Sequence, residues 1–170
     1  GIIMFEFSRF YQRDFEHGRD FVLALDAFLA ELPTEEWDFG VEIRNPEFLK
    51  KPYFDTLARH RVGHVYNQWQ RMPSLAEQIT LQVPDREVTP IASRLLLKCG
   101  RNYKSAVKSF EPYDRIQEPQ LGVRSAASSL IRKLAEKPKG RRSFLYVNNR
   151  LEGNALSTIA AILTIAGYSI

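Results

Sequence analysis

The sequence predicts an α/β fold, and three observations support this prediction. Apolar runs typical of buried strands alternate with segments of helical periodicity along the 170 residues. The strands recur every few tens of residues, and a helix follows each, which is typical of a parallel sheet with helical crossovers. Hydrophobic residues (44%) and charged residues (26%) are at globular levels, which excludes disordered, collagen-like and coiled-coil chains.

Five strand-then-helix units are predicted. Each strand is a short run that changes from apolar to polar residues at its carboxyl end. The predicted strands cover residues 2–7, 38–45, 62–68, 93–98 and 143–148.

The first helix is expected over residues 14–32, because apolar side chains recur there at three- and four-residue spacing. Asp14 is the expected N-cap, and Pro33 ends the helix. Pro52 suits the first turn of the second helix.

The later helices have clear start signals. Ser74 and Glu77 have the spacing of a capping box. Helices over 105–110 and 119–135 are expected after the fourth strand, and Asn154 is expected to cap the last helix.

Two architectures fit five such units. One is a complete five-stranded, doubly wound parallel sheet. The other is a (β/α)8 barrel without its first three units, in which roughly 80 of about 250 residues would be absent. The chain enters a strand directly after Gly1, which favours the partial barrel. In both cases residues 1–170 are expected to form one domain.

Several classes are excluded or disfavoured by composition. The single cysteine excludes a disulfide framework and a multi-cysteine metal site. No uncharged apolar run reaches the ~20 residues of a membrane span, and no signal peptide is evident, so a cytoplasmic location without membrane contact is expected. No HExxH, GxGxxG or phosphate-loop motif is found, and the sequence leaves the identity of any cofactor open.

Charge is unevenly distributed around a net value of +4. Residues 1–60 hold 7 basic and 12 acidic side chains, whereas residues 86–142 hold 14 basic and 5 acidic ones, a balance of +9. The densest stretch runs from Arg132 to Arg142 and includes Lys137, Lys139 and Arg141. This segment could meet nucleic acid, although no aromatic residues interleave with it for base stacking. A solvated helix face is the alternative.

Polar residues at the strand ends are the best functional candidates, because sites in parallel sheets gather there. Glu42 and Arg44 share one face of their strand. Arg44 could hold an anion in a bidentate grip while Glu42 orients it or moves protons. Glu6 could join Glu42 as an acid/base pair or in a metal site. The alternative is a structural ion pair.

Further candidates follow the other strand ends. Lys98, on an otherwise apolar strand, could bind phosphate or carboxylate. The segment 148–154 joins a strand to a helix start, where free amides favour anions. The remaining candidate ligand-binding residues are Asn45, Asn67, Trp69, Arg101, Asn148, Asn149 and Asn154.

Three segments in order resemble the YecE-like (DUF72) family of TIM-barrel proteins. They are Glu-Ile-Arg-Asn at 42–45, Lys-Cys-Gly-Arg-Asn-Tyr at 98–103, and Tyr-Val-Asn-Asn at 146–149. The resemblance spans nearly the whole chain and implies the C-terminal five-eighths of a barrel. Many relatives carry Arg and His just before the glycine that matches Gly100, where this chain has Lys98 and Cys99. Lys98 is therefore the expected substitute. The family implies no settled reaction.

The leading functional hypothesis is a TIM-barrel protein that binds a small anionic or phosphorylated ligand at the carboxyl face of the strands. If it is an enzyme, a hydrolase or lyase reaction would use Glu42 or Glu6 as the general acid or base. The first alternative is a barrel that binds or processes nucleic acid through residues 86–142. The second is a scaffold whose polar strand ends are structural only.

Overall fold

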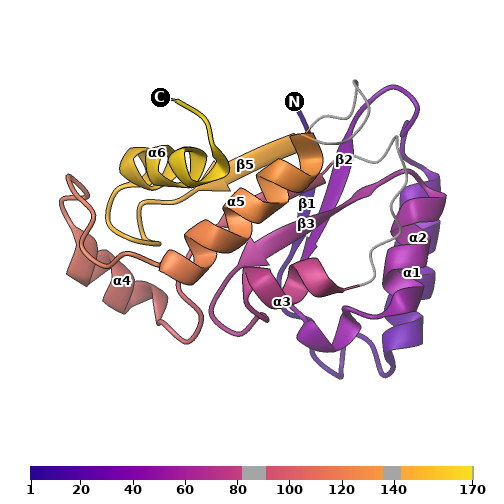
Figure 1. Ribbon diagram of the computed structural model, residues 1–170. Helices are drawn as coiled ribbons and strands as arrows, with labels where there is room; N and C mark the ends of the chain where they lie inside the picture. The colour runs from indigo at the N-terminus through magenta and orange to yellow at the C-terminus, as the bar shows by residue number, and fades with distance from the viewer. Residues whose placement is uncertain (82–90, 136–142, 170) are drawn as a thin grey trace. The chain divides into compact units, whose positions relative to one another are not determined.

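The computed structural model of the protein describes residues 1–81, 91–135 and 143–169. Five parallel strands form an open sheet with the order β1-β2-β3-β4-β5, and helices flank it (Figure 1). The strands are β1 (Ile3–Phe7), β2 (Phe39–Ile43), β3 (Gly63–Gln68), β4 (Ile91–Leu95) and β5 (Ser143–Val147). The helices are α1 (Gly18–Ala30), α2 (Lys51–Arg59), α3 (Leu75–Thr80), α4 (Tyr103–Phe110), α5 (Leu121–Ala135) and α6 (Ala155–Ala166), with a 3-10 turn η1 (Pro46–Phe48).

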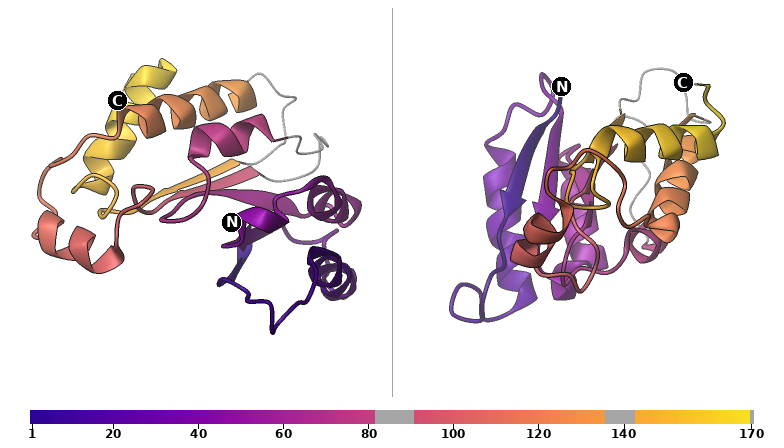
Figure 2. Two further views of the ribbon diagram at one scale, coloured as in Figure 1. Left: turned by 90° about the horizontal axis from the view of Figure 1, so that it is seen from below. Right: turned by 90° about the vertical axis from the view of Figure 1, so that its left-hand side faces the viewer.

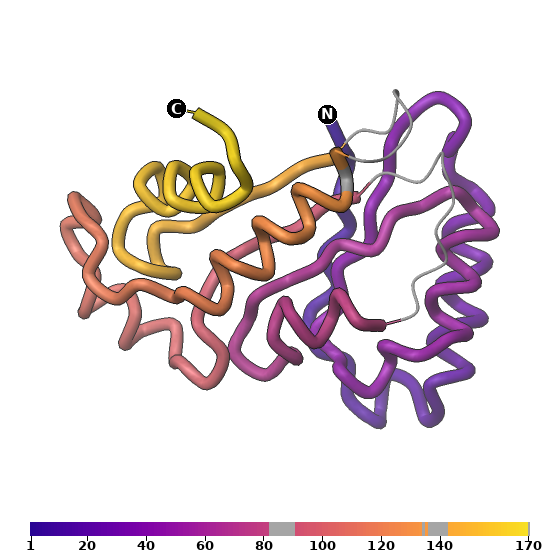
Figure 3. Tube along the Cα trace, viewed as in Figure 1, coloured from indigo at the N-terminus to yellow at the C-terminus, as the bar shows by residue number. Residues whose placement is uncertain are grey.

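This architecture confirms the predicted α/β class and the five parallel strands. The chain passes from each strand into a helical segment before the next strand (Figure 3). The strands lie in the sheet in chain order, as neighbouring strands of a barrel also do. The open sheet therefore matches the five-stranded alternative and is also compatible with part of a (β/α)8 barrel.

The chain divides into two compact units. Among the described residues, the first unit contains 1–65, 81, 91–92 and 143–144, and the second contains 66–80, 93–135 and 145–169. We describe each unit separately. A single domain over residues 1–170 stays a prediction.

In the first unit, β1 pairs with β2, and α1 packs beside α2 (Figure 2). Helix α1 buries Phe21, Leu25 and Leu29, as the three- and four-residue spacing predicts. Phe21 stacks on Phe48 with ring centroids 4.7 Å apart, and Tyr53 lies 6.4 Å away on α2. Aromatic packing of this kind fixes the starts of both helices.

In the second unit, α5 packs against both α3 and α6. The Ser128 hydroxyl donates to the carbonyl of Ile162 at 2.8 Å and joins α5 to α6. A separate buried cluster of Leu97, Ala106 and Phe110 packs α4 against the segment that follows β4. This second cluster supports the loop that carries Lys98.

Two of the predicted helix caps are confirmed. Glu77 accepts a hydrogen bond from the Ser74 amide at 2.8 Å, and the Glu77 amide donates back to the Ser74 hydroxyl at 3.3 Å. The Asn154 side chain accepts from the Ser157 amide at 2.8 Å and caps α6. Both motifs are local, so the sequence alone is sufficient to identify them.

The predicted start of the first helix is wrong. Helix α1 begins at Gly18 with His17 as its N-cap, and the His17 amide donates to Asp20 at 3.0 Å. Asp14 instead accepts from the Tyr11 amide at 2.8 Å in the preceding turn. An aspartate stabilises a turn as readily as a helix start, which explains the error.

The predicted end of the fourth strand is also wrong. Strand β4 ends at Leu95, although Leu96 and Leu97 continue the apolar run. The amides of Leu96 and Leu97 both donate to the Gln68 carbonyl, at 3.2 and 3.0 Å. Leu97 packs on the α4 cluster, so its apolar character serves helix packing and Lys98 lies on a loop.

No helix in the described part of the chain combines the length and the apolar character that crossing a membrane requires. The expected cytoplasmic location stays a prediction.

Candidate functional site

Glu6, Glu42 and Arg44 form one ion-pair group in the first unit, here called the Arg44 cluster. Parallel pairing places Glu6 of β1 opposite Glu42 of β2. Arg44 Nη2 lies 2.7 Å from Glu42 Oε1 and 3.3 Å from Glu6 Oε1. The structure therefore brings together both predicted catalytic carboxylates and the predicted anion-binding arginine.

Burial differs sharply within the Arg44 cluster. The Glu42 side chain is 0% exposed and that of Arg44 is 8% exposed, whereas that of Glu6 is 41% exposed. Among these three side chains, two carboxylates share one guanidinium. This balance weighs against the prediction that Arg44 itself holds an anionic ligand, because an incoming anion would meet two negative groups.

Asn45 ties the end of β2 to the loop that follows β1. Its side chain accepts from the Phe10 amide at 2.8 Å and donates to the Phe10 carbonyl at 3.0 Å. It also donates to Glu47 at 2.8 Å. These bonds hold the loop between β1 and α1 in place, so the described contacts of this predicted ligand-binding residue are structural.

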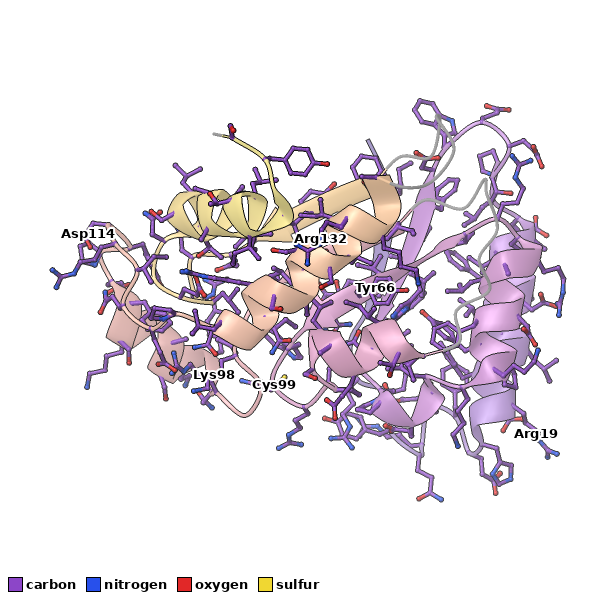
Figure 4. The ribbon with its side chains drawn as sticks, viewed as in Figure 1. Arg19, Tyr66, Lys98, Cys99, Asp114 and Arg132 are labelled. Carbon is purple, nitrogen blue, oxygen red and sulfur yellow. The ribbon has the colours of Figure 1, made fainter. Side chains whose placement is uncertain are left out.

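Lys98, Arg101 and Glu118 form a second ion-pair group, here called the Glu118 cluster, in the second unit. Lys98 Nζ donates to Glu118 Oε1 at 2.8 Å, and Arg101 donates to the other carboxylate oxygen. Figure 4 shows Lys98 beside Cys99 on the loop that follows β4. The Arg101 guanidinium also lies over the Phe110 ring, 4.8 Å from its centroid.

The charge balance of the Glu118 cluster is the reverse of that of the Arg44 cluster. Two cations surround one carboxylate, which leaves a net charge of +1. The hydrogen bond from Arg101, followed by that from Lys98, lowers the pKa of Glu118 from 4.5 to about 2. The side chains of Lys98 (46% exposed) and Glu118 (37% exposed) are open to solvent. The cluster is therefore a water-accessible cationic pair that already holds an anion.

A neighbouring loop sets the position of Glu118. The amides of Gln117 and Glu118 donate to the Glu152 carbonyl at 2.7 and 3.1 Å. Gly153 has φ +115°, and a Cβ at this position would lie 2.5 Å from the Arg115 carbonyl oxygen. Only glycine permits this approach, so the segment after α4 and the segment after β5 are held in register.

The three asparagines near the end of β5 shape their own loop. The Asn148 side chain accepts from the Arg150 amide at 3.0 Å, and the Asn149 side chain accepts from the Ala155 amide at 2.7 Å. Asn154 caps α6 and also donates to the Tyr113 carbonyl at 2.9 Å. Ligand binding by these asparagines stays a prediction, and their described bonds are all internal.

Asn67 and Trp69 lie in the packed part of the second unit. Asn67 is fully buried. Its backbone amide donates to the Gln78 side chain at 3.1 Å, and the Gln78 side chain donates to the Asn67 carbonyl at 2.5 Å. Trp69 is partly buried against the Leu97 cluster. The contacts of both residues therefore support the fold.

Sequence reasoning missed two acidic groups. Glu118 lies in an irregular connection, where its only signal is an acidic residue in a basic segment. Glu152 is fully buried and forms a bidentate pair with Arg124, with Nε–Oε1 at 2.9 Å and Nη2–Oε2 at 2.6 Å. No group of three potential metal ligands occurs among residues 1–81, 91–135 and 143–169.

The basic segment 86–142 is only partly described. Lys137, Lys139 and Arg141 lie outside the described residues. Arg132 donates to the Ile165 carbonyl at 2.7 Å, and Arg124 is paired with buried Glu152. Two cations of this segment thus already have hydrogen-bond partners within the protein, which weighs against a continuous nucleic-acid surface.

Comparisons with known proteins agree with this fold. A DUF72 family protein from Thermotoga maritima is 15% identical to this chain with a TM-score of 0.60, and the match covers 99% of this chain and 58% of that one. A DUF72 family protein from Enterococcus faecalis matches in two structures at 12% and 14% identity, with TM-scores of 0.56 and 0.54. These two matches cover 98% and 99% of this chain, and 58% and 61% of the Enterococcus chains.

At these identities the likeness shows the fold alone, and this chain spans less than two thirds of the length of these relatives. No curated protein matches the chain. The family model described as "Protein of unknown function DUF72" matches residues 1–169. The expected resemblance is thereby confirmed, and the chain belongs to the DUF72 family.

Proposed function

We propose that the protein binds a small anionic ligand, a carboxylate or a phosphate group, at the Glu118 cluster. The observation that carries this proposal is the convergence of Lys98 and Arg101 on the two oxygens of one carboxylate. A guanidinium and an ammonium arranged in this way suit any group that presents two anionic oxygens. Both residues belong to the predicted ligand-binding set.

In this proposal Glu118 is an internal anion that the ligand replaces. Electrostatics favours this exchange. Lys98 and Arg101 carry two positive charges, of which Glu118 neutralises one, and a phosphate carries more negative charge than a carboxylate. Arg150 adds a further cation near this loop, with its guanidinium 4.5 Å from the ring centroid of Tyr103. Arg101 keeps its place on the Phe110 ring during the exchange.

Titration with inorganic phosphate tests the proposal. Lys98→Gln or Arg101→Gln should weaken binding roughly tenfold, since a hydrogen bond to a charged group is worth about 1.5–3 kcal/mol. Lys104→Gln is the matched control, because Lys104 is exposed on α4 and outside the cluster. Equal phosphate affinity in all four proteins would reject the proposal. Thermal unfolding of each variant checks that the fold is retained.

The salt dependence of binding separates a small anion from nucleic acid. Binding of an oligonucleotide should weaken steeply with added salt, with a slope that grows with the number of phosphates contacted. We expect no such steep binding of a single-stranded oligonucleotide, because Arg124 and Arg132 are already hydrogen-bonded within the protein. Tight, steeply salt-dependent oligonucleotide binding would instead support the nucleic-acid alternative.

We also propose that, if the protein catalyses a hydrolysis or elimination, Glu6 is the general acid or base. The observation favouring Glu6 over Glu42 is its exposed carboxylate, which Arg44 holds in place at 3.3 Å. Glu42 is buried and would position Arg44. In a screen of phosphate esters, Glu6→Gln should lower any observed kcat on the order of 100-fold. An unchanged kcat would remove Glu6 from this role.

A further inference from the structure

A cavity of about 400 Å³ lies in the first unit, outside both ion-pair clusters. The first turns of α1 and α2 and the η1 turn form it. Figure 4 labels Arg19, one of its lining residues, near the N-terminal end of α1. Its size is within the range of sites that hold small organic molecules. The residues used below are Gly18, Arg19, Glu47, Phe48 and Lys50.

The walls of this cavity are mainly apolar and are firmly supported. Phe48 stacks on buried Phe21 with an interplanar angle of 14°, which fixes the ring. Tyr53 behind it is fully buried. Gly18 faces the same ring, since a Cβ at Gly18 would lie 3.5 Å from Phe48. The absence of a side chain at position 18 therefore leaves part of the Phe48 ring open to the cavity.

The charged groups of the cavity favour a negatively charged ligand group. The basic residues that line the cavity are Arg19 and Lys50, and the acidic one is Glu47. Asn45 donates to Glu47 at 2.8 Å, and Asp20 lies 3.5 Å from Arg19. Lys50 is exposed and forms no ion pair with any residue in the described ranges. Its ammonium is thus available to a ligand.

We propose that this cavity binds a small amphiphilic carboxylate, a molecule with one apolar ring or short chain and one terminal carboxylate. The apolar part would contact Phe48 through the opening at Gly18. The carboxylate would pair with Lys50 and Arg19 at the rim. This proposal is independent of the Glu118 cluster, which lies in the other unit.

Hydrocinnamate is a suitable probe, and two analogues of the same shape provide the charge test. These are the neutral hydrocinnamamide and the cationic phenylpropylamine, titrated while amide NMR signals are followed. We expect hydrocinnamate to bind roughly tenfold more tightly than the amide, the amine to bind least, and signals of 18–23 and 47–53 to shift. Equal binding of the three compounds, or shifts confined to other residues, would overturn the proposal.

Two pairs of variants locate the binding. Gly18→Leu should fill the opening and reduce hydrocinnamate affinity at least about tenfold, whereas Gly122→Leu, in the first turn of α5 with open space around it, should leave affinity unchanged. Lys50→Gln should remove most of the preference for the acid over the amide. Lys51→Gln is its control, because Lys51 is paired with Asp55 and does not line the cavity.

The two pairs protect the test against misfolding. If Gly18→Leu fails to fold, Lys50→Gln still decides the question, because Lys50 is an exposed side chain. Retention of full acid preference in Lys50→Gln would contradict the proposed carboxylate contact. Loss of affinity in Gly122→Leu to the same extent as in Gly18→Leu would show that the cavity is not the site.

Discussion

The Arg44 cluster and the Glu118 cluster use the same chemical groups in opposite proportions. In the first, one guanidinium serves two carboxylates, and Glu42 and Arg44 are buried. In the second, two cations serve one carboxylate, and Lys98 and Glu118 reach water. The ratio of cations to carboxylates in each cluster determines the sign of the ligand charge that it favours. The burial of each ion pair determines how much that pair contributes to the stability of the fold.

The two clusters are expected to differ in their contribution to stability because their charged groups differ in desolvation. A buried ion pair has lost its hydration, so removal of one partner leaves a charge with nothing to replace the lost water. An exposed pair regains water when a partner leaves, so it contributes little to stability and is free to exchange its anion. We therefore expect the buried Glu42–Arg44 pair to contribute most to fold stability, and we propose ligand exchange at the Glu118 cluster.

Replacement of Arg44 should have the largest effect on stability. Arg44→Met leaves the Glu42 carboxylate buried without its guanidinium and should lower the free energy of unfolding by about 3–5 kcal/mol, measured in urea. Arg44→Lys keeps the charge and should recover part of this loss. A loss below about 1 kcal/mol in Arg44→Met would contradict the contrast drawn above.

Replacement of Glu118 should act on binding. Glu118→Gln removes the internal anion while keeping the shape of the side chain, so inorganic phosphate should bind several-fold more tightly, by roughly 1 kcal/mol. Calorimetric titration of the variant and the native protein measures this difference. Weaker binding by the variant would mean that Glu118 supports the site and does not compete for it.

The pH dependence of stability isolates the Glu118 contacts. The pKa of Glu118 in the folded protein is about 2, below the value of 4.5 for the free group, so the carboxylate stabilises the fold when ionised. The stability advantage over Glu118→Gln should be full above about pH 5 and should disappear as the pH falls towards 2. Urea unfolding across this range measures it. If the native protein were still more stable than Glu118→Gln at pH 2, the difference in stability would come from packing and not from the ionised carboxylate.

The smallest effect is expected for an exposed helical pair. Lys51 Nζ lies 2.6 Å from Asp55 Oδ2 one turn along α2. Lys51→Gln should lower the free energy of unfolding by only about 0.3–0.5 kcal/mol, in the range of surface pairs four residues apart on a helix. Urea unfolding checks this value. A loss of unfolding free energy as large as that in Arg44→Met would show that burial does not determine how much an ion pair stabilises this fold.

Much of the fold was predictable, because its signals are local. Apolar periodicity gave the buried face of α1, and the Ser74–Glu77 and Asn154 caps follow from short motifs. The errors arose where one residue type serves two purposes. Asp14 stabilises a turn instead of a helix start, and Leu97 packs on α4 instead of extending β4.

Only part of the candidate sites was predictable. Strand alternation placed Glu42 and Arg44 on one face, and parallel pairing aligned Glu6 with Glu42. Glu118 was missed because it meets Lys98 across a separation of 20 residues that includes α4, a distance over which no sequence pattern operates. The cavity at Gly18 was missed for a similar reason, since it arises from the packing of two helix starts.

Gly153, in the loop after β5, affects the geometry of the proposed anion site without contacting the ligand. Any larger residue there would collide with the backbone of the segment that carries Glu118 and would shift its carboxylate away from Lys98 and Arg101. A substitution at Gly153 would then change ligand affinity, although this residue does not contact the ligand.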